Sequence, residues 1–243
     1  MKKIFILSLL VCIGFTTSFA QMKKVALISV FGSRNLSDDP MEGKIYEVLM
    51  KDSSFNLVKI VNNFDVLIRD KFVPQFPFPF FPKEEVVNAA GYQDLRALTR
   101  WAKDNYYTTS ATSYVPIAAF GIVNDNDAIK KAFEVVPGAD GVMIAYIDFN
   151  IFTSGGFGPL AKKKIAAYCN LKIFNKDAKR IFKLRERAVS NDGTMSVAGY
   201  LTDVKEIMPM IEQAATNLFA DMQEKLPKSL AKMAKQMDKY NKD

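Results

Sequence analysis

The chain has 243 residues, of which 49% are hydrophobic and 19 are phenylalanine, and it carries a formal net charge of +7 at pH 7. This apolar content is enough for a substantial core, which excludes a disordered or low-complexity chain. Histidine is absent, which excludes Ser-His-Asp and Cys-His catalysis, the usual histidine-containing zinc sites and haem ligation by imidazole.

The first twenty residues, Met1 to Ala20, have the pattern of a cleaved secretory signal peptide. Two lysines form a positive start, the apolar run after them is too short to span a bilayer, and small residues precede Gln21. The alternatives are a membrane anchor, a buried helix, or lipid attachment at Cys12, which the bulky residue before it disfavours. We expect an exported, periplasmic protein that is either free or peripheral to the outer membrane.

Cys169 is the one cysteine that remains after this cleavage, so the mature chain has no partner for an internal disulfide. It alternates with apolar residues from Ile165 to Ile173, a pattern that indicates a strand. We interpret Cys169 as a small buried side chain rather than a nucleophile.

The mature chain begins with a predicted strand and helix. Apolar residues on both faces of Lys23 to Phe31 predict an interior strand. Asp39 as N-cap and Pro40 in the first turn predict a helix start, whose apolar face comprises Met41, Ile45, Val48 and Leu49. No Gly-x-Gly-x-x-Gly or Walker spacing follows the strand, so no phosphate site is predicted. A weaker strand over Phe55 to Val61 and a short helix over Phe64 to Phe72 complete this part.

The segment from Val73 to Pro82 contains four prolines and four phenylalanines, which excludes a helix or a central strand and favours an extended path. Two interpretations stand. The rings cap a satellite cluster of the core, or the segment is a docking or membrane-touching element. Under the second interpretation, the partner-binding residues are Phe76, Phe78, Phe80 and Phe81.

The middle of the chain predicts a helix, a strand and a second helix. Helical spacing runs from Lys83 to Asn105 and places Trp101 in the core. Val115 to Val123 predicts a strand that begins at a sheet edge. Asn124 to Asp127 is interpreted as the N-cap of a helix over Ala128 to Val136, although its four oxygen-bearing side chains also allow a calcium site.

The C-terminal half predicts a three-stranded antiparallel meander with strands over Val142 to Phe152, Lys163 to Phe174 and Arg180 to Val189. The glycine-rich link Thr153 to Pro159 is interpreted as a hairpin connection, with a ligand cradle as the alternative. Asn175 to Ala178 forms the second turn.

The chain closes with a predicted helix over Val204 to Leu226, which Pro209 kinks or starts. Pro227 to Asp243 is a separate basic amphipathic tail. Its apolar stripe comprises Leu230, Met233, Met237 and Tyr240, and lysines cover its other side. The tail is a solvated terminal helix, or it makes a weak contact with an anionic membrane surface.

The order of these elements resembles a group of Gram-negative envelope domains. The group includes the periplasmic domain of the curli secretion lipoprotein, the lipoprotein activator of a bifunctional penicillin-binding protein, and the N-terminal domain of the Tol-Pal translocation protein. Local signs are Asn126 to Ile129 at a helix start, Gly138 to Val142 entering a strand, and Leu171 to Lys179 with its lysine-rich turn. The resemblance implies a non-enzymatic domain that binds a protein partner in the envelope.

We therefore predict an α/β (α+β) fold: a signal peptide over residues 1–20, one domain over 21–226 with a mixed sheet of four or five strands, and the tail over 227–243. The first function hypothesis is an exported, non-enzymatic binding or assembly module that contacts an envelope protein. The alternatives are a carrier or sensor of an apolar ligand, held between the sheet and the Val87 to Trp101 helix, and a hydrolase that uses two carboxylates. No cofactor, metal or nucleic acid is expected, and the oligomeric state stays open.

Overall fold

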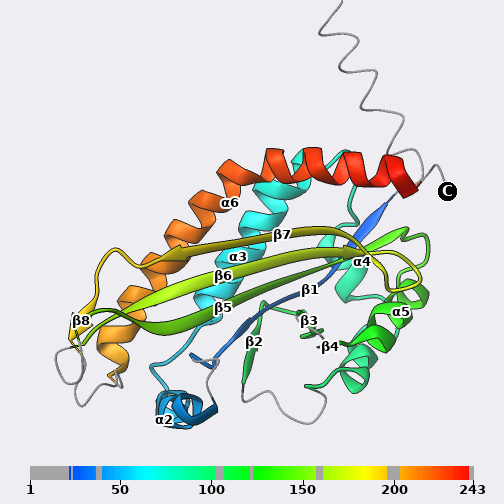
Figure 1. Cartoon of the computed structure of the whole chain (residues 1–243). Helices are drawn as coiled ribbons and strands as arrows, with labels where there is room; N and C mark the ends of the chain where they lie inside the picture. Colours follow the sequence, from blue (N-terminus) through cyan, green and yellow to red (C-terminus); the bar gives the residue numbers. More distant parts are fainter. Residues whose placement is uncertain are drawn as a thin grey trace, which may run out of the picture.

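One open, mixed sheet organises the fold (Figure 1). The computed structural model describes residues 22, 24–36, 40–101, 107–120, 123–156, 161–195 and 203–240, so the predicted signal peptide lies outside the described residues. The strand order is β2-β1-β5-β6-β7, and β8 pairs with β6 beside this row. The strands are β1 (Val25–Ser33), β2 (Thr108–Ser110), β5 (Gly141–Gly155), β6 (Lys162–Phe174), β7 (Arg180–Val189) and β8 (Thr194–Met195).

The predicted fold class is confirmed, and the sheet has six strands rather than four or five. The two short strands β2 and β8 account for the difference. A separate two-stranded hairpin joins β3 (Ala119–Phe120) to β4 (Val123–Asn124).

Strand β1 is an interior strand, as predicted. It runs parallel to β5 and antiparallel to β2, and the eight residues from Val25 to Gly32 are buried. Ser29 is the polar exception on this strand. Its hydroxyl donates to the Val115 carbonyl at 2.7 Å and accepts from the Ile117 amide at 3.0 Å. This side chain thereby ties the loop at residues 114–118 to the sheet.

The antiparallel meander β5-β6-β7 is also confirmed, with strand bounds close to those predicted. Alternation along these strands places one set of side chains against the helices and the other set on the opposite face. The turn between β6 and β7 contains Ala178 in the left-handed region at φ 58°, and the Asn175 side chain accepts the amides of Asp177 and Lys179.

The helices cover one face of the meander and the end of the sheet near β1 (Figure 1). The α-helices are α2 (Pro40–Lys51), α3 (Val58–Leu67), α4 (Lys83–Val87), α5 (Asn126–Val135) and α6 (Val204–Tyr240). Shorter turns are the π-helical η1 (Ile68–Phe72) and the 3-10 helices η2 (Val73–Gln75) and η3 (Gln93–Leu98). No helix in the described ranges is both long and apolar enough to cross a membrane.

The predicted strand at Phe55 to Val61 is wrong, because α3 begins at Val58 and continues through η1 and η2 past Pro74. Ile60, Val61 and Phe64 form a buried face with helical spacing. In α2, Leu49 is buried as predicted, but Val48 is 51% exposed.

Two further predictions in the middle of the chain are wrong. The single helix from Lys83 to Asn105 is broken at Gly91, whose φ of +81° is incompatible with a helix. The predicted strand over Val115 to Val123 is a buried loop followed by the short β3–β4 hairpin. Pro116 has no amide to donate to a ladder, and the flanking amides use the Ser29 and Tyr92 side chains as acceptors. Trp101 is half-buried.

Helix α6 is one continuous helix through Pro209 and Pro227, so the break predicted at Pro227 does not occur. It packs on β6 and β7 and against α3. Phe219 of α6 stacks on Phe64 of α3, with ring centroids 5.6 Å apart and an interplanar angle of 3°. The predicted tail therefore begins inside a helix that is packed on the core.

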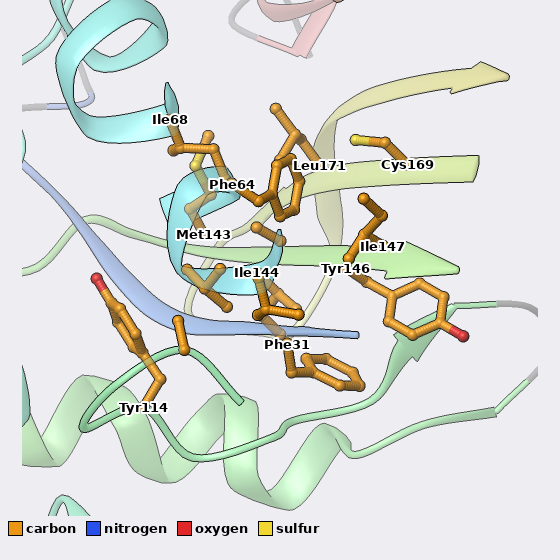
Figure 2. Packing of buried hydrophobic residues seen from close by; sticks show 14 of the residues in the cluster. Phe31, Phe64, Ile68, Tyr114, Met143, Ile144, Tyr146, Ile147, Cys169 and Leu171 are labelled. Carbon is orange, nitrogen blue, oxygen red and sulfur yellow. The ribbon is translucent and has the colours of Figure 1, made fainter. Parts of the chain in front are cut away.

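The core lies on both faces of the sheet around β1 and β5. Figure 2 shows Phe64, Leu171 and Cys169 on one side of these strands and Phe31 and Tyr146 on the other. Cys169 is fully buried, as predicted. Burial raises the pKa of its thiol well above the ordinary value, which disfavours the nucleophilic thiolate.

Candidate functional site

The phenylalanine-proline segment is tied to the start of β1. The Val25 amide donates to the Pro79 carbonyl at 3.0 Å, and the Phe81 amide donates to the Val25 carbonyl at 2.9 Å. Phe76 and Phe78 are 7% and 4% exposed. The segment thus runs beside the first residue of β1, which β2 does not reach, and the rings of Phe76 and Phe78 turn inward in the core-capping arrangement.

The four phenylalanines differ in what they offer to a partner. Phe76 contacts the rings of Phe78, Phe80 and Phe182, each centroid 5.4 Å away. Phe80 and Phe81 are partly buried against the core. The Lys24 ammonium lies 3.8 Å from the centroid of the Phe81 ring. Partner binding through this segment stays a prediction, in which Phe80 and Phe81 supply the accessible surface.

A buried carboxylate, Asp65, joins α3 to the start of α4. Its side chain is 3% exposed and accepts from Arg69 at 3.0 and 3.2 Å and from Lys83 at 2.9 Å. The Lys83 ammonium also lies 4.7 Å from the centroid of the Tyr114 ring. Burial, followed by the charge of Asp65, raises the pKa of the Tyr114 hydroxyl. Two cations saturate the carboxylate, so this cluster is suited to holding elements together.

Asp125 occupies the N-cap position of α5, as predicted, but its side chain does not cap that helix. It accepts from the amides of Ala118 at 2.6 Å and Arg100 at 3.3 Å. Burial raises the pKa of Asp125 from its ordinary value, and these bonds oppose the change. The carboxylate therefore organises the loops beside the β3–β4 hairpin. Among the described residues, no three His, Cys, Asp or Glu side chains gather where they could hold a metal ion.

Two surface pockets lie on the helical side of the molecule. One of about 270 Å³ is lined by Arg34, Met50, Asp52, Phe55 and their neighbours, and one of about 170 Å³ lies between α3 and α6. The space predicted for an apolar ligand, between the sheet and residues 87–101, contains the fully buried side chains of Tyr92 and Leu95. Neither pocket lies there.

The face of β6 and β7 that points away from α6 is strongly basic, and we call it the basic face. On β7, exposed Lys183, Arg185 and Arg187 alternate with Phe182, Leu184 and Ala188, which are buried beneath α6. The register places β6 side chains directly beside them. The basic face comprises Lys164, Tyr168, Asn170, Lys172, Lys183, Arg185 and Arg187.

Two acids, Asp148 and Glu186, lie on the strands of the basic face or beside them. Asp148 of β5 is the acid that the register places on this side, across from Tyr168. Glu186 points to the other side, where it accepts from Lys225 of α6 at 2.6 Å. Within the described ranges, Lys183 and Arg185 form no ion pair. The face thus presents positive charge to solvent.

Arg187 is held in place by aromatic neighbours. Its Nε donates to the Tyr168 hydroxyl at 3.0 Å, and its guanidinium carbon lies 5.5 Å from the centroid of that ring and 5.3 Å from that of Phe152. A guanidinium fixed in this way keeps donors available for a carboxylate or phosphate at a reduced entropic cost.

Lys172 lies at the end of the basic face nearest the β3–β4 hairpin, is 5% exposed, and donates to the Ala119 carbonyl. Burial, followed by the charges of Arg180, Lys183 and Arg185, lowers its pKa to about 8. Lys183 lies directly across from it in the register, and burial, followed by Arg180 and Arg185, lowers its pKa too. This concentration of positive charge is unfavourable for the fold, and a bound anion would relieve it.

The lowered pKa of Lys172 predicts a pH dependence of stability. Below about pH 8, Lys172 is charged in both the folded and the unfolded state, and burial of this charge destabilises the folded state in full. Above about pH 10.5, the lysine is neutral in both the folded and the unfolded state. Wild type should therefore gain stability relative to Lys172→Met as the pH rises from 8 to 10.5, by on the order of 2 kcal/mol. Urea unfolding of both proteins across this range measures the difference. A constant difference would contradict the assignment.

The sequence contains a signal for the basic face. Cations at alternate positions from Lys183 to Arg187 predict an exposed, charged strand face. In the sequence as a whole, lysines and arginines occur in most segments, so this row does not stand out as a cluster. Its cations form a patch because α6 covers the other face of the strand.

Comparisons with known proteins do not assign the chain to a family. No family model and no curated protein matches it. Similar solved structures include a hypothetical protein of Chlamydia trachomatis, with 12% identity over 86% of this chain and 98% of that chain and a TM-score of 0.41. A homolog of neuraminyllactose-binding hemagglutinin from Helicobacter pylori has 10% identity over 90% of both chains and a TM-score of 0.40. A lipoprotein of Neisseria meningitidis has 12% identity over 82% of this chain and 99% of that chain, with a TM-score of 0.31.

These likenesses are too low to carry an argument about fold or function. The three proteins are also different from the envelope domains that the order of elements resembles, so that resemblance stays a prediction.

Proposed function

We propose that the mature chain is a non-enzymatic binding module of the bacterial cell envelope, and that it binds an acidic protein partner on its basic face. The observation that carries the proposal is the row of Lys183, Arg185 and Arg187, whose side chains are exposed and form no ion pair with any residue that the structure describes. The signal-peptide pattern of Met1 to Ala20 supports an exported, periplasmic location.

The chemistry of the site favours binding over catalysis. The two buried carboxylates, Asp65 and Asp125, are held by cations or backbone amides rather than paired with each other across a cleft. The thiol of Cys169 is buried and protonated. The Lys183, Arg185 and Arg187 side chains of the basic face, by contrast, are exposed and all positively charged, which suits steering and recognition of a negatively charged surface.

Capture from solubilised envelopes of the exporting bacterium tests this function. The double variant Lys183→Glu/Arg185→Glu should lose a specific protein that wild type retains, and capture by wild type should fall as ionic strength rises, because solvent-exposed charge pairs are screened. The measurement is the amount of each captured protein by quantitative mass spectrometry.

The matched control is Lys228→Glu/Lys232→Glu, which changes net charge equally but on exposed positions of α6. Solubilised envelopes contain no bilayer, so the predicted contact of the C-terminal lysines with an anionic membrane stays a prediction. Of the predicted apolar stripe, Met233 is buried, so its side chain is not available for such a contact. Equal capture by wild type and both variants would overturn the proposed function.

A further inference from the structure

We propose that β7 binds an extended acidic segment of the partner protein as an added β-strand. This inference rests on the proposed function and deepens it, because it specifies the conformation and the charge pattern of the bound segment. Strand addition needs a free sheet edge, outward backbone groups and side chains that select the incoming sequence.

Strand β7 is the last in the sheet order and has a strand on one side (Figure 1). The Ser190 amide donates to the Ile165 carbonyl at 2.8 Å, which identifies this opposing pair as hydrogen-bonded. Hydrogen-bonded pairs alternate along antiparallel strands. The even-numbered residues of β7, like Ser190, therefore bond to β6. Lys183, Arg185 and Arg187 lie between them, so their backbone groups point away from β6.

A second contact supports this alternation. The Val189 carbonyl, which has the same parity as Arg187, accepts from Asn217 Nδ2 of α6 at 2.8 Å rather than from β6. At Lys183 and Arg185, the described residues supply no partner for the outward backbone groups. The edge is thus engaged by α6 at Val189, whereas its backbone groups at Lys183 and Arg185 have no hydrogen-bond partner among the described residues.

The side chains at this edge select acidic residues. In an added strand, alternate side chains would lie about 5 Å from those of Lys183, Arg185 and Arg187 on the same face of the sheet. Acidic residues at every second position would form three cross-strand ion pairs, and the Arg187 guanidinium is already fixed by Tyr168.

The same charges discriminate among other occupants. A second copy of this chain paired through β7 would place cations opposite cations, which is destabilising. An anionic membrane would meet the side-chain charges but would leave the outward amides and carbonyls of β7 unused. An extended acidic protein segment uses both features.

The test uses the purified mature protein and a synthetic peptide of alternating glutamate and valine. The first control is the same peptide with N-methyl groups at alternate residues. It keeps the charge of the peptide but loses the backbone amide donors that would face β7. The second control has the same composition with the glutamates in one block. We expect the alternating peptide to bind, and each control to bind at least about tenfold more weakly, the loss expected from one or two missing contacts.

Protein variants provide the reciprocal test. Arg185→Gln and Arg185→Pro both remove the charge, but proline also removes the outward amide, and an edge position tolerates it. Arg185→Pro should bind the alternating peptide at least about tenfold more weakly than Arg185→Gln, with Tm of both measured to show that they are folded. If Arg185→Pro unfolds, the comparison of the alternating peptide with the N-methylated peptide alone tests strand addition.

Two results would overturn strand addition. The first is equal binding of the alternating, N-methylated and block peptides. The second is tight binding to phosphatidylglycerol vesicles together with none to the alternating peptide. If either result is found while wild type still captures an envelope protein that Lys183→Glu/Arg185→Glu loses, the proposed function stands without strand addition. If wild type and the variants capture equally, the proposed function itself is overturned.

Discussion

Replacing Asp65 with asparagine should destabilise the protein by about 3 kcal/mol, because it leaves Lys83 and Arg69 without their counter-charge at a buried position. The Lys83 side chain is 15% exposed and cannot reach solvent as freely as a surface lysine. In a domain of this size, the loss corresponds to a fall in Tm of roughly 6 to 12 °C. Urea unfolding with an unchanged m-value measures it.

The matched control is Asp70→Asn, an exposed acid one turn further along the same helical stretch. It should change the free energy of unfolding by less than about 0.5 kcal/mol. If both variants lose the same stability, Asp65 contributes no more than a surface charge, and the link between α3 and α4 must come from apolar packing alone.

Replacing Phe76 with alanine should cost about 3–5 kcal/mol, the range for deleting a buried phenylalanine ring. Phe76 packs against three other rings, including Phe182 of β7. The loss is a cavity between the phenylalanine-proline segment and the sheet. Thermal and urea unfolding measure it.

Val66→Ala is the control for Phe76→Ala, because Val66 is 46% exposed on α3 and alanine has a higher helix propensity. We expect almost no change in Tm for this variant. A Phe76→Ala protein as stable as Val66→Ala would show that the segment is not part of the core, and would restore Phe76 and Phe78 as accessible partner-binding residues.

The sequence predicted the meander well because its strands are long and their alternation is regular. The strand predicted at Phe55 to Val61 was wrong because a short apolar run fits a strand and a helix equally. The break at Gly91 was not predicted, since a glycine inside a helical pattern does not reveal whether its φ is positive.

The buried polar contacts could be predicted in part. Asp65 and Arg69 both lie in the helix predicted over Phe64 to Phe72, and they have the i,i+4 spacing of a helical ion pair, so this contact could be predicted from the sequence. Lys83 is far from Asp65 in sequence, so its contact depends on the fold. The basic face likewise depends on which side of β7 is covered by α6, which no local pattern specifies.

Site-specific photo-crosslinking in the exporting bacterium tests whether an envelope protein docks on the basic face. A benzophenone amino acid replaces Tyr168 on the basic face or, as the matched position, Val66 on the helical side. We predict a discrete adduct with one protein from position 168, reduced by Lys183→Glu/Arg185→Glu, and none from position 66. An adduct from position 66 alone, or the same adducts from both positions, would contradict the claim.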